Sequence, residues 1–322
     1  MREELLFRVD TPYRRSLPVK GWYFGDPQQK SLAVMGSLRG NEIQQMYVCS
    51  LLIQSLVDLE RQGLLAPDAG ILVVPCANQF SMNVGRRFWA ADNTDINRMF
   101  PGYDQGETTQ RIAGRIFTAI QGYTYGVHLT SFYLSGDHLP HVRIMATGYE
   151  QAEEGLFFGL PYVVVRHPQP YDTTTLNYNW QIWNTQAFSL YTPETESINQ
   201  DTALQAVQAI LRFLYAKGLC LRDVPSPGVT PEILQESCLH NIISASGGLL
   251  LRARAPGDVV KPGQILGDIL DPCGGQLLEH LRSDCTGRVF FARKSRLIDG
   301  HEVAFRILPD ARCRVIPSGE QA

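Results

Sequence analysis

Apolar residues follow two alternating patterns through most of the chain. Short, mainly apolar runs are typical of strands buried on both faces, and repeats at every third or fourth position are typical of amphipathic helices. The runs lie at 31–36, 70–75, 125–129, 161–166 and 186–191. The helical repeats lie at 42–62, 108–120 and 201–217. Strands that alternate with helices predict an α/β fold, with helices on both faces of the sheet.

The helical repeat ends near the Pro/Ser/Gly-rich segment at 225–231. From about Ser237, short apolar runs are instead separated by glycine turns such as Gly247-Gly248 and Gly274-Gly275. Turns at this spacing predict a small all-β module. We therefore expect an α/β domain over residues 1–228 and a C-terminal β module over residues 229–322.

Composition narrows the class of protein. The chain has 322 residues, is 44% hydrophobic and 19% charged, and carries a net charge of −3. The lack of a long basic run argues against nucleic acid or an anionic membrane surface as a partner. The N-terminus has acids where a signal peptide has bases, and no apolar stretch reaches the ~18 residues of a membrane span. Seven cysteines without a Cys-x-x-Cys pair fit reduced thiols, so we expect a cytoplasmic protein.

Two polar motifs stand where a site could form. Arg39-Gly40-Asn41-Glu42 lies at a strand-to-helix turn, and ligand sites in α/β folds form at the carboxyl ends of strands. Glu42 either points back over the sheet edge or complements the helix N-terminus. In Asp95-Ile96-Asn97-Arg98, Arg98 offers a planar fork for a carboxylate, Asn97 adds an amide, and Arg87 adds positive charge. The alternative is that Asp95 and Arg98 pair with each other.

Histidines supply candidate metal ligands. His128 ends a predicted strand and is either a ligand or a satisfied core residue. Asp137, His138 and His141 add three further candidates. Pro140, between the two later histidines, argues against a helix that would bring both to one face.

Candidate proton-transfer groups follow the predicted strand that ends at Tyr191. Glu194 or Glu196 could act as a general base, and Tyr191 could donate a hydrogen bond to an oxyanion. The alternative for the two glutamates is that they are acids placed ahead of the helix at 201–217.

Taken in order, these motifs resemble the succinylglutamate desuccinylase/aspartoacylase family, which is related to the zinc carboxypeptidases. The family pattern has a strand followed by Gly-x-His-Gly-Asn-Glu, whose last four positions correspond to Arg39–Glu42, and a strand with Pro and Asn corresponds to Pro75–Asn78. Asp-x-Asn-Arg-x-Phe-Pro-Gly corresponds to Asp95–Gly102, and Asp-Leu-His corresponds to Gly126–His128. The resemblance covers nearly the whole chain and implies a carboxypeptidase-like mixed sheet flanked by helices, followed by a barrel-sandwich-like β domain.

The resemblance also implies an activity, which is zinc-dependent hydrolysis of a C–N amide bond in an N-acyl amino acid or similar small carboxylate. Glu42 and His128 would be zinc ligands, with a third ligand from Asp137, His138 or His141. A catalytic zinc needs three protein ligands and an open position for water. The substrate carboxylate would be bound by Asn97 and Arg98, and a later glutamate, Glu194 or Glu196, would be the general base.

Three positions depart from the family pattern. Arg39 stands at the first histidine ligand and cannot bind zinc, because its guanidinium stays protonated. Gly126 replaces the Asp of Asp-Leu-His, and Tyr191 falls where the catalytic Glu would align. The alternative function is therefore a catalytically inactive relative, in which Arg39 takes the place of zinc and the old site binds an anionic small molecule.

The β module has a resemblance of its own. Gly257–Gln264 resembles the hairpin of biotinyl/lipoyl-like folds, but no Lys occupies a Met-Lys-like tip, so a carrier role is not expected. We expect this module to shape the pocket mouth or to mediate homo-oligomerisation.

Overall fold

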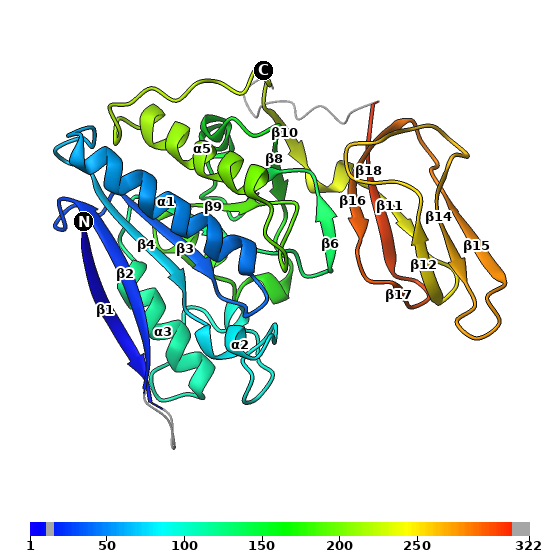
Figure 1. Cartoon of the computed structure of the whole chain (residues 1–322), viewed down its shortest axis with the longest axis horizontal. Coiled ribbons are helices and arrows are strands. Elements are labelled where there is room, and N and C mark those ends of the chain that lie inside the picture. Colours follow the sequence, from blue (N-terminus) through cyan, green and yellow to red (C-terminus); the bar gives the residue numbers. More distant parts are fainter. Residues whose placement is uncertain (11–15, 311–322) are drawn as a thin grey trace. The chain divides into compact units, whose positions relative to one another are not determined.

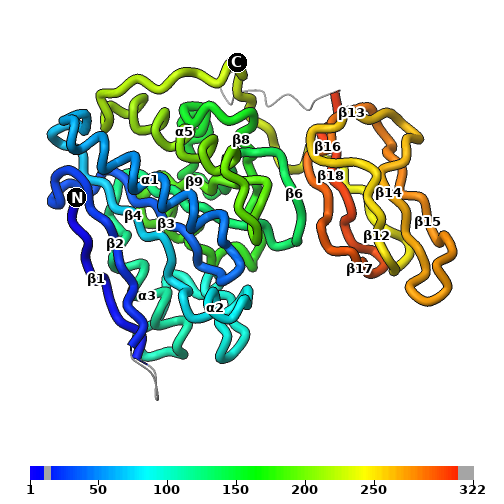
Figure 2. Tube along the Cα trace, in the orientation of Figure 1, coloured from blue at the N-terminus to red at the C-terminus, as the bar shows by residue number. Residues whose placement is uncertain are grey.

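The computed structural model describes residues 1–10 and 16–310, which form two compact units traced in Figures 1 and 2. One unit holds Met1–Ser131 and His141–Glu232; the other holds Phe132–Pro140 and the chain from Ile233 onward. Residues 132–140 were expected in the first domain. They belong to the second unit because strand β6 (Gly136–His138) pairs with β16 (Gly287–Arg293).

The first unit is built on a mixed sheet with its strands in the order β1-β2-β4-β3-β5-β9-β7-β8. These strands are β1 (Arg2–Val9), β2 (Leu17–Gly25), β3 (Leu32–Ser37), β4 (Gly70–Cys76), β5 (Tyr125–Leu129), β7 (His141–Met145), β8 (Tyr162–Arg166) and β9 (Gln186–Tyr191). The helices are α1 (Ile43–Arg61), α2 (Gln79–Asn83), α3 (Thr108–Ile120), α4 (Leu176–Ile182) and α5 (Gln200–Ala216). Strand β10 (Glu232–Gln235) starts at the boundary between the units.

The predicted strands and long helices are confirmed, as β3, β4, β5, β8 and β9 and as α1, α3 and α5. The sequence pattern missed the hairpin of β1 and β2, whose registered pairing is antiparallel. Its residues are mostly half-exposed or exposed, so no unbroken apolar run marks these strands. Among the described residues, no helix is long and apolar enough to cross a membrane.

Helices cover both faces of the sheet (Figure 1). Helix α1 packs on β3, β4 and α5. The opposite face is closed by an apolar core that contains Ile116 of α3 and Trp180 of α4 together with Ala33 and Met35 of β3. Because successive side chains of a strand point to opposite faces, this two-sided burial explains why β3 reads as a continuous apolar run.

The central strands set the place of the site. β3 runs parallel to both β4 and β5, and β5 runs parallel to β9. Their carboxyl ends, at Ser37, Cys76, Leu129 and Tyr191, therefore meet at one edge of the sheet. This edge is where an α/β fold forms a ligand site.

The second unit is an all-β module, as predicted. One sheet has the order β11-β18-β16-β13, with β6 paired to β16, and the other has the order β15-β14-β12-β17. Its remaining strands are β11 (His240–Ile243), β12 (Gly248–Arg252), β13 (Val259–Val260), β14 (Ile265–Leu270), β15 (Leu277–Arg282), β17 (Leu297–Ile298) and β18 (Val303–Pro309). An apolar core from both sheets, including Leu250, Leu266 and Phe305, holds the module together.

Candidate functional site

Glu42 is an anchor at the carboxyl edge of the sheet. Its carboxylate is fully buried and turns back over the strand end. Oε2 accepts hydrogen bonds from the backbone N–H groups of Leu38 and Arg39, both at 3.0 Å. Oε1 accepts from the Ser131 N–H at 3.0 Å, the Ser131 hydroxyl at 2.7 Å and Arg39 Nη1 at 3.2 Å. Both oxygens are thus saturated by donors from the chain itself.

Arg39 bridges two carboxylates and is only 3% exposed. Beyond its bond to Glu42, its Nε and Nη2 donate to Asp95 Oδ2 at 3.1 and 2.9 Å. Burial alone would lower the pKa of Arg39, but the carboxylates of Asp95 and Glu42 raise it above its ordinary value. The guanidinium therefore stays charged. The partner of Asp95 is Arg39, and the alternative pairing of Asp95 with Arg98 is wrong.

Gly40 makes this turn possible. A Cβ on Gly40 would lie 2.3 Å from the Arg86 carbonyl oxygen and 2.5 Å from the Met82 nitrogen. The Gly40 N–H donates to the Arg87 carbonyl oxygen at 2.9 Å. The close backbone contact thereby holds the loop that carries Arg87 against the Arg39 turn.

His128 is buried beside this network, with 1% exposure. Its Nε2 has no hydrogen-bond partner within the part of the chain that the structure describes. Burial, and then the positive charges of Arg39 and Arg143, lower the pKa of His128 to about 3. The imidazole is therefore neutral at physiological pH.

The donor set does not fit a catalytic zinc. Of the two expected ligands, Glu42 has its oxygens occupied, and the cation beside it is the guanidinium of Arg39. Within residues 1–10 and 16–310, no group of three His, Cys, Asp or Glu side chains with ligand atoms close enough for one ion includes Glu42 or His128. The described residues at this edge therefore do not supply the three protein ligands that a catalytic zinc needs.

The three candidates for the third ligand have other contacts. Asp137 pairs with Arg252 at 2.8 Å, and the ring of His138 packs on Phe291 with centroids 4.8 Å apart. The ring of His141 stacks on Tyr191 at 4.7 Å with parallel planes.

The side chain of Arg98 forms no ion pair within the described residues, 1–10 and 16–310. Arg98 is half-buried, and its side chain donates from Nη1 to the Asn97 carbonyl oxygen, at 3.3 Å. Burial, and then repulsion from Arg39, lower the pKa values of both Arg98 and Arg87. The repulsion from Arg39 indicates positive potential around Arg98 and Arg87, which favours an anion.

Asn97 has a structural role beside Arg98. It is 6% exposed, and its Oδ1 accepts from the Leu176 N–H at the start of α4, at 3.0 Å. Asp95 Oδ1 in turn accepts from the Asn97 N–H at 3.0 Å and caps the short 3-10 helix Ile96–Arg98. These bonds fix the loop that presents Arg98.

The candidate proton-transfer residues have different surroundings. Glu194 accepts from the Thr202 hydroxyl at 2.7 Å and from Asn199 Nδ2 at 3.2 Å, so its carboxylate is engaged at the N-terminus of α5. Glu196 is exposed, accepts from Asn41 Nδ2 at 2.9 Å and interacts electrostatically with Arg87. Tyr191 is buried and interacts electrostatically with Arg39 and Arg98.

Several participants were missed from the sequence. Ser131 gives two hydrogen bonds to Glu42, and Arg143 lies with its guanidinium carbon 4.7 Å from the Tyr191 ring centroid. Ser131 lies two residues beyond β5. Polar residues directly after a buried parallel strand are therefore a sequence signal from which it could have been predicted. Arg143 is on β7, and only its pairing with β9 brings it to this edge.

The glycine at position 126 is explained by packing. A Cβ there would lie 2.7 Å from one indole carbon of Trp180 and 2.9 Å from another. Trp180 is fully buried, and its Nε1 donates to the Ile120 carbonyl oxygen at 3.2 Å. The indole thus fills the space that a side chain at position 126 would need.

Comparisons with known proteins agree on one family. Residues 28–216 match the profile of the succinylglutamate desuccinylase/aspartoacylase catalytic domain. No curated protein matches the sequence significantly.

Solved structures share the fold at low identity. A succinylglutamate desuccinylase from Silicibacter sp. TM1040 is 15% identical with a TM-score of 0.78, over 95% of this chain and 94% of that chain. The product-bound ectoine utilization protein EutE (DoeB) from Ruegeria pomeroyi is 16% identical with a TM-score of 0.78, over 95% and 94%. An aspartoacylase family protein from Mesorhizobium loti is 19% identical with a TM-score of 0.74, over 97% and 100%. Since the matched profile spans more than half of the chain, this protein belongs to the succinylglutamate desuccinylase/aspartoacylase family.

Proposed function

We propose that this chain binds a small carboxylate anion without a metal, at the carboxyl edge of its central strands. The observation that carries the proposal is the guanidinium of Arg39, which bridges Glu42 and Asp95 where the family pattern has its first zinc ligand. A cation held by two carboxylates satisfies Glu42 in the way a metal would. It offers no open coordination position at which water could be activated.

The ligand would be held by the arginines around this bridge. Arg39 is neutralised by its two carboxylate partners, whereas Arg98 has no acidic partner among the described residues. An Arg fork binds a carboxylate through two parallel hydrogen bonds. Arg87, on the neighbouring loop, adds positive charge and is partly balanced by Glu196.

The family supports an N-acyl amino acid as the ligand class, because its members are named as desuccinylases and acylases of amino acids. The Ruegeria pomeroyi protein with the same fold was solved with its product bound, which supports a small-molecule site in this fold. Zinc-dependent amide hydrolysis is the competing function. The saturated Glu42 and the cation at position 39 argue against it.

Calorimetric titration in the presence of a chelator tests the proposal. N-succinylglutamate and a panel of other N-acyl amino acids are the probes, and at least one is expected to bind the chelated protein. A charge-assisted hydrogen bond contributes about 1.5–3 kcal/mol, so Arg98→Gln should weaken binding about 10-fold to 100-fold. Arg86→Gln is the matched control, because Arg86 is an exposed arginine of the same region and should leave affinity unchanged.

Two outcomes would overturn the proposal. One is that no N-acyl amino acid binds the chelated protein. The other is that zinc addition produces hydrolysis of a probe that the chelated protein does not hydrolyse, which would support the zinc-dependent deacylase.

A further inference from the structure

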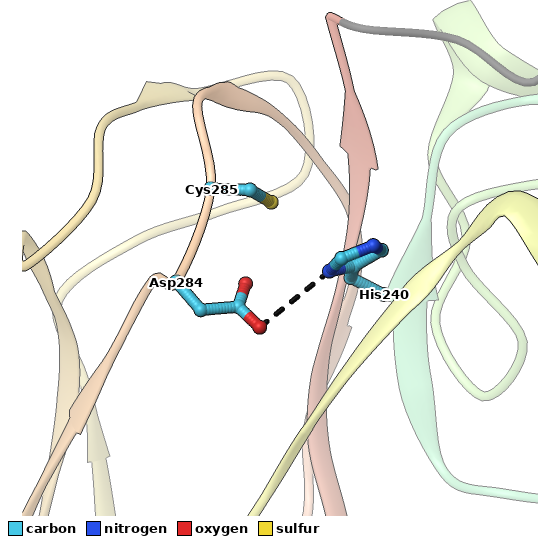
Figure 3. Close-up of side chains that lie close together, drawn as sticks. All are labelled: His240, Asp284 and Cys285. Carbon is cyan, nitrogen blue, oxygen red and sulfur yellow. Dashed lines mark ion pairs between the residues drawn. The ribbon is translucent and has the colours of Figure 1, made fainter.

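A second cluster of ligand-type side chains lies within the β module. His240, Asp284 and Cys285 place a nitrogen, an oxygen and a sulfur within 4.8 Å of one another. Figure 3 shows these side chains close together. His240 Nδ1 lies 3.5 Å from Asp284 Oδ2. His240 and Asp284 are exposed, and Cys285 is half-buried, so solvent can reach the cluster.

The backbone on both sides of the cluster is fixed. His240 opens β11 and is registered opposite Ile307 of β18. Asp284 and Cys285 lie in the loop between β15 and β16, next to the buried Ser283. The Ser283 N–H donates to the Gln264 carbonyl oxygen at 3.0 Å, and its hydroxyl donates to the Cys285 carbonyl oxygen at 2.7 Å. The backbone positions of the three residues are therefore fixed before any ligand arrives.

We propose that His240, Asp284 and Cys285 form a binding site for a divalent transition-metal ion, with zinc the best match. Imidazole, carboxylate and thiolate are the three ligand types that zinc accepts. Calcium and magnesium are disfavoured, because both prefer oxygen ligands alone. Two ligands at zinc distances of about 2.0–2.3 Å lie about 3.3–3.8 Å apart in a tetrahedron. Small rotations of these exposed side chains bring the three donor atoms into that range.

Metal binding at this place would tie β11 to the loop that connects the two sheets of the module. His240 lies on β11, and the loop with Asp284 and Cys285 runs from β15 of one sheet to β16 of the sheet that contains β11. An ion that binds only the folded module stabilises it by mass action. Burial and the neighbouring Asp284 raise the pKa of the Cys285 thiol to about 11. Coordination therefore converts the thiol to a thiolate and releases one proton to the solvent.

Titration of the chelator-treated full-length protein with zinc, and separately with cobalt, tests the site. One equivalent of metal is expected, and the cobalt form should show a sulfur-to-cobalt charge-transfer band in the near ultraviolet. Cys285→Ser should abolish that band, and both Cys285→Ser and His240→Ala should weaken zinc binding at least tenfold. Hydrogen exchange of the β11 amides should slow when zinc is added.

Matched controls separate this site from other histidines and thiols. His280 forms a similar pair with Asp268, at 2.7 Å, but among the described residues no cysteine joins this pair in a cluster of possible metal ligands. The His280→Ala protein should therefore bind zinc normally. Cys273→Ser removes an exposed thiol outside the cluster and should also have no effect. Absence of zinc binding, or zinc binding that Cys285→Ser leaves unchanged, would overturn the proposal. His128→Gln should not alter the titration; a loss there would instead place zinc at the Glu42 edge.

Discussion

Replacement of Arg39 by Met should destabilise the first unit strongly. The substitution keeps most of the apolar stem but removes the cation that pairs with Glu42 at 3.2 Å and with Asp95 at 2.9 Å. Glu42 is fully buried, so its remaining charge cannot be solvated. Removal of one partner of a buried ion pair costs about 3–5 kcal/mol. We expect a loss of this size in the free energy of unfolding.

Urea denaturation followed by tryptophan fluorescence measures this loss. The four tryptophans, Trp22, Trp89, Trp180 and Trp183, all belong to the first unit, so the signal reports on that unit alone. The midpoint should fall while the dependence on urea stays constant. Lys20→Met is the control, because Lys20 pairs with Glu3 on the surface and such pairs contribute about 0–1 kcal/mol.

A second substitution distinguishes the two contributions to this loss of stability, which are the unpaired carboxylate charge and the lost packing of the Arg39 side chain. In the Arg39→Met background, Asp95→Asn removes the carboxylate charge that Arg39 had neutralised and keeps an oxygen to accept from the Asn97 N–H. About 1 kcal/mol or more should be recovered. A loss below about 1 kcal/mol in Arg39→Met, or no recovery in the double variant, would refute the role of Arg39 as the buried cation that neutralises Glu42 and Asp95.

Three further substitutions test the neighbouring residues. Arg39→His in a Cys285→Ser background should gain one equivalent of zinc by titration, because it restores a nitrogen donor beside Glu42; no uptake would contradict the resemblance to a zinc half-site. His128 has a folded pKa of about 3, below its ordinary 6.5. As the pH falls below 6.5 the unfolded state alone takes up a proton, so the free energy of unfolding should fall by about 1.4 kcal/mol per pH unit. His128→Gln should remove this pH dependence in urea titrations, and an unchanged dependence would show that another group causes it. Gly126→Ala should lower the free energy of unfolding by about 1–3 kcal/mol in the same assay, because its Cβ would overlap the Trp180 indole. An unshifted urea midpoint would rule out that overlap.

The elements of the α/β unit were largely predictable from local pattern. All residues of β3 are buried, and α1 buries one set of its side chains, so the apolar spacing of each element is visible in a short window of sequence. The hairpin of β1 and β2 was not predictable, because its half-exposed residues leave no such spacing. The insertion of 132–140 into the β module depends on pairing of β6 with β16, which is remote in sequence.

The residues of the candidate site were predictable from the sequence, but their pairings were not. Arg39, Glu42, Asn97, Arg98 and His128 were identified from residue type and order, and the structure places the first two in direct contact. The alternative in which Asp95 pairs with Arg98 was wrong, because Arg39 reaches Asp95 across 56 positions of sequence. That distance is closed only when the carboxyl end of β3 and the loop after α2 meet.

The amino-acid sequence by itself determined five strands and the three long helices of the α/β unit, the all-β character of the module and the presence of a cation where the family pattern has a zinc ligand. Each of these depends on residues close together in the chain or on residue type alone. Only the tertiary structure decided that Glu42 has its oxygens saturated by Leu38, Arg39 and Ser131. The physical reason is that hydrogen bonds and ion pairs depend on distance in space, and the parallel strands bring together groups that the sequence separates.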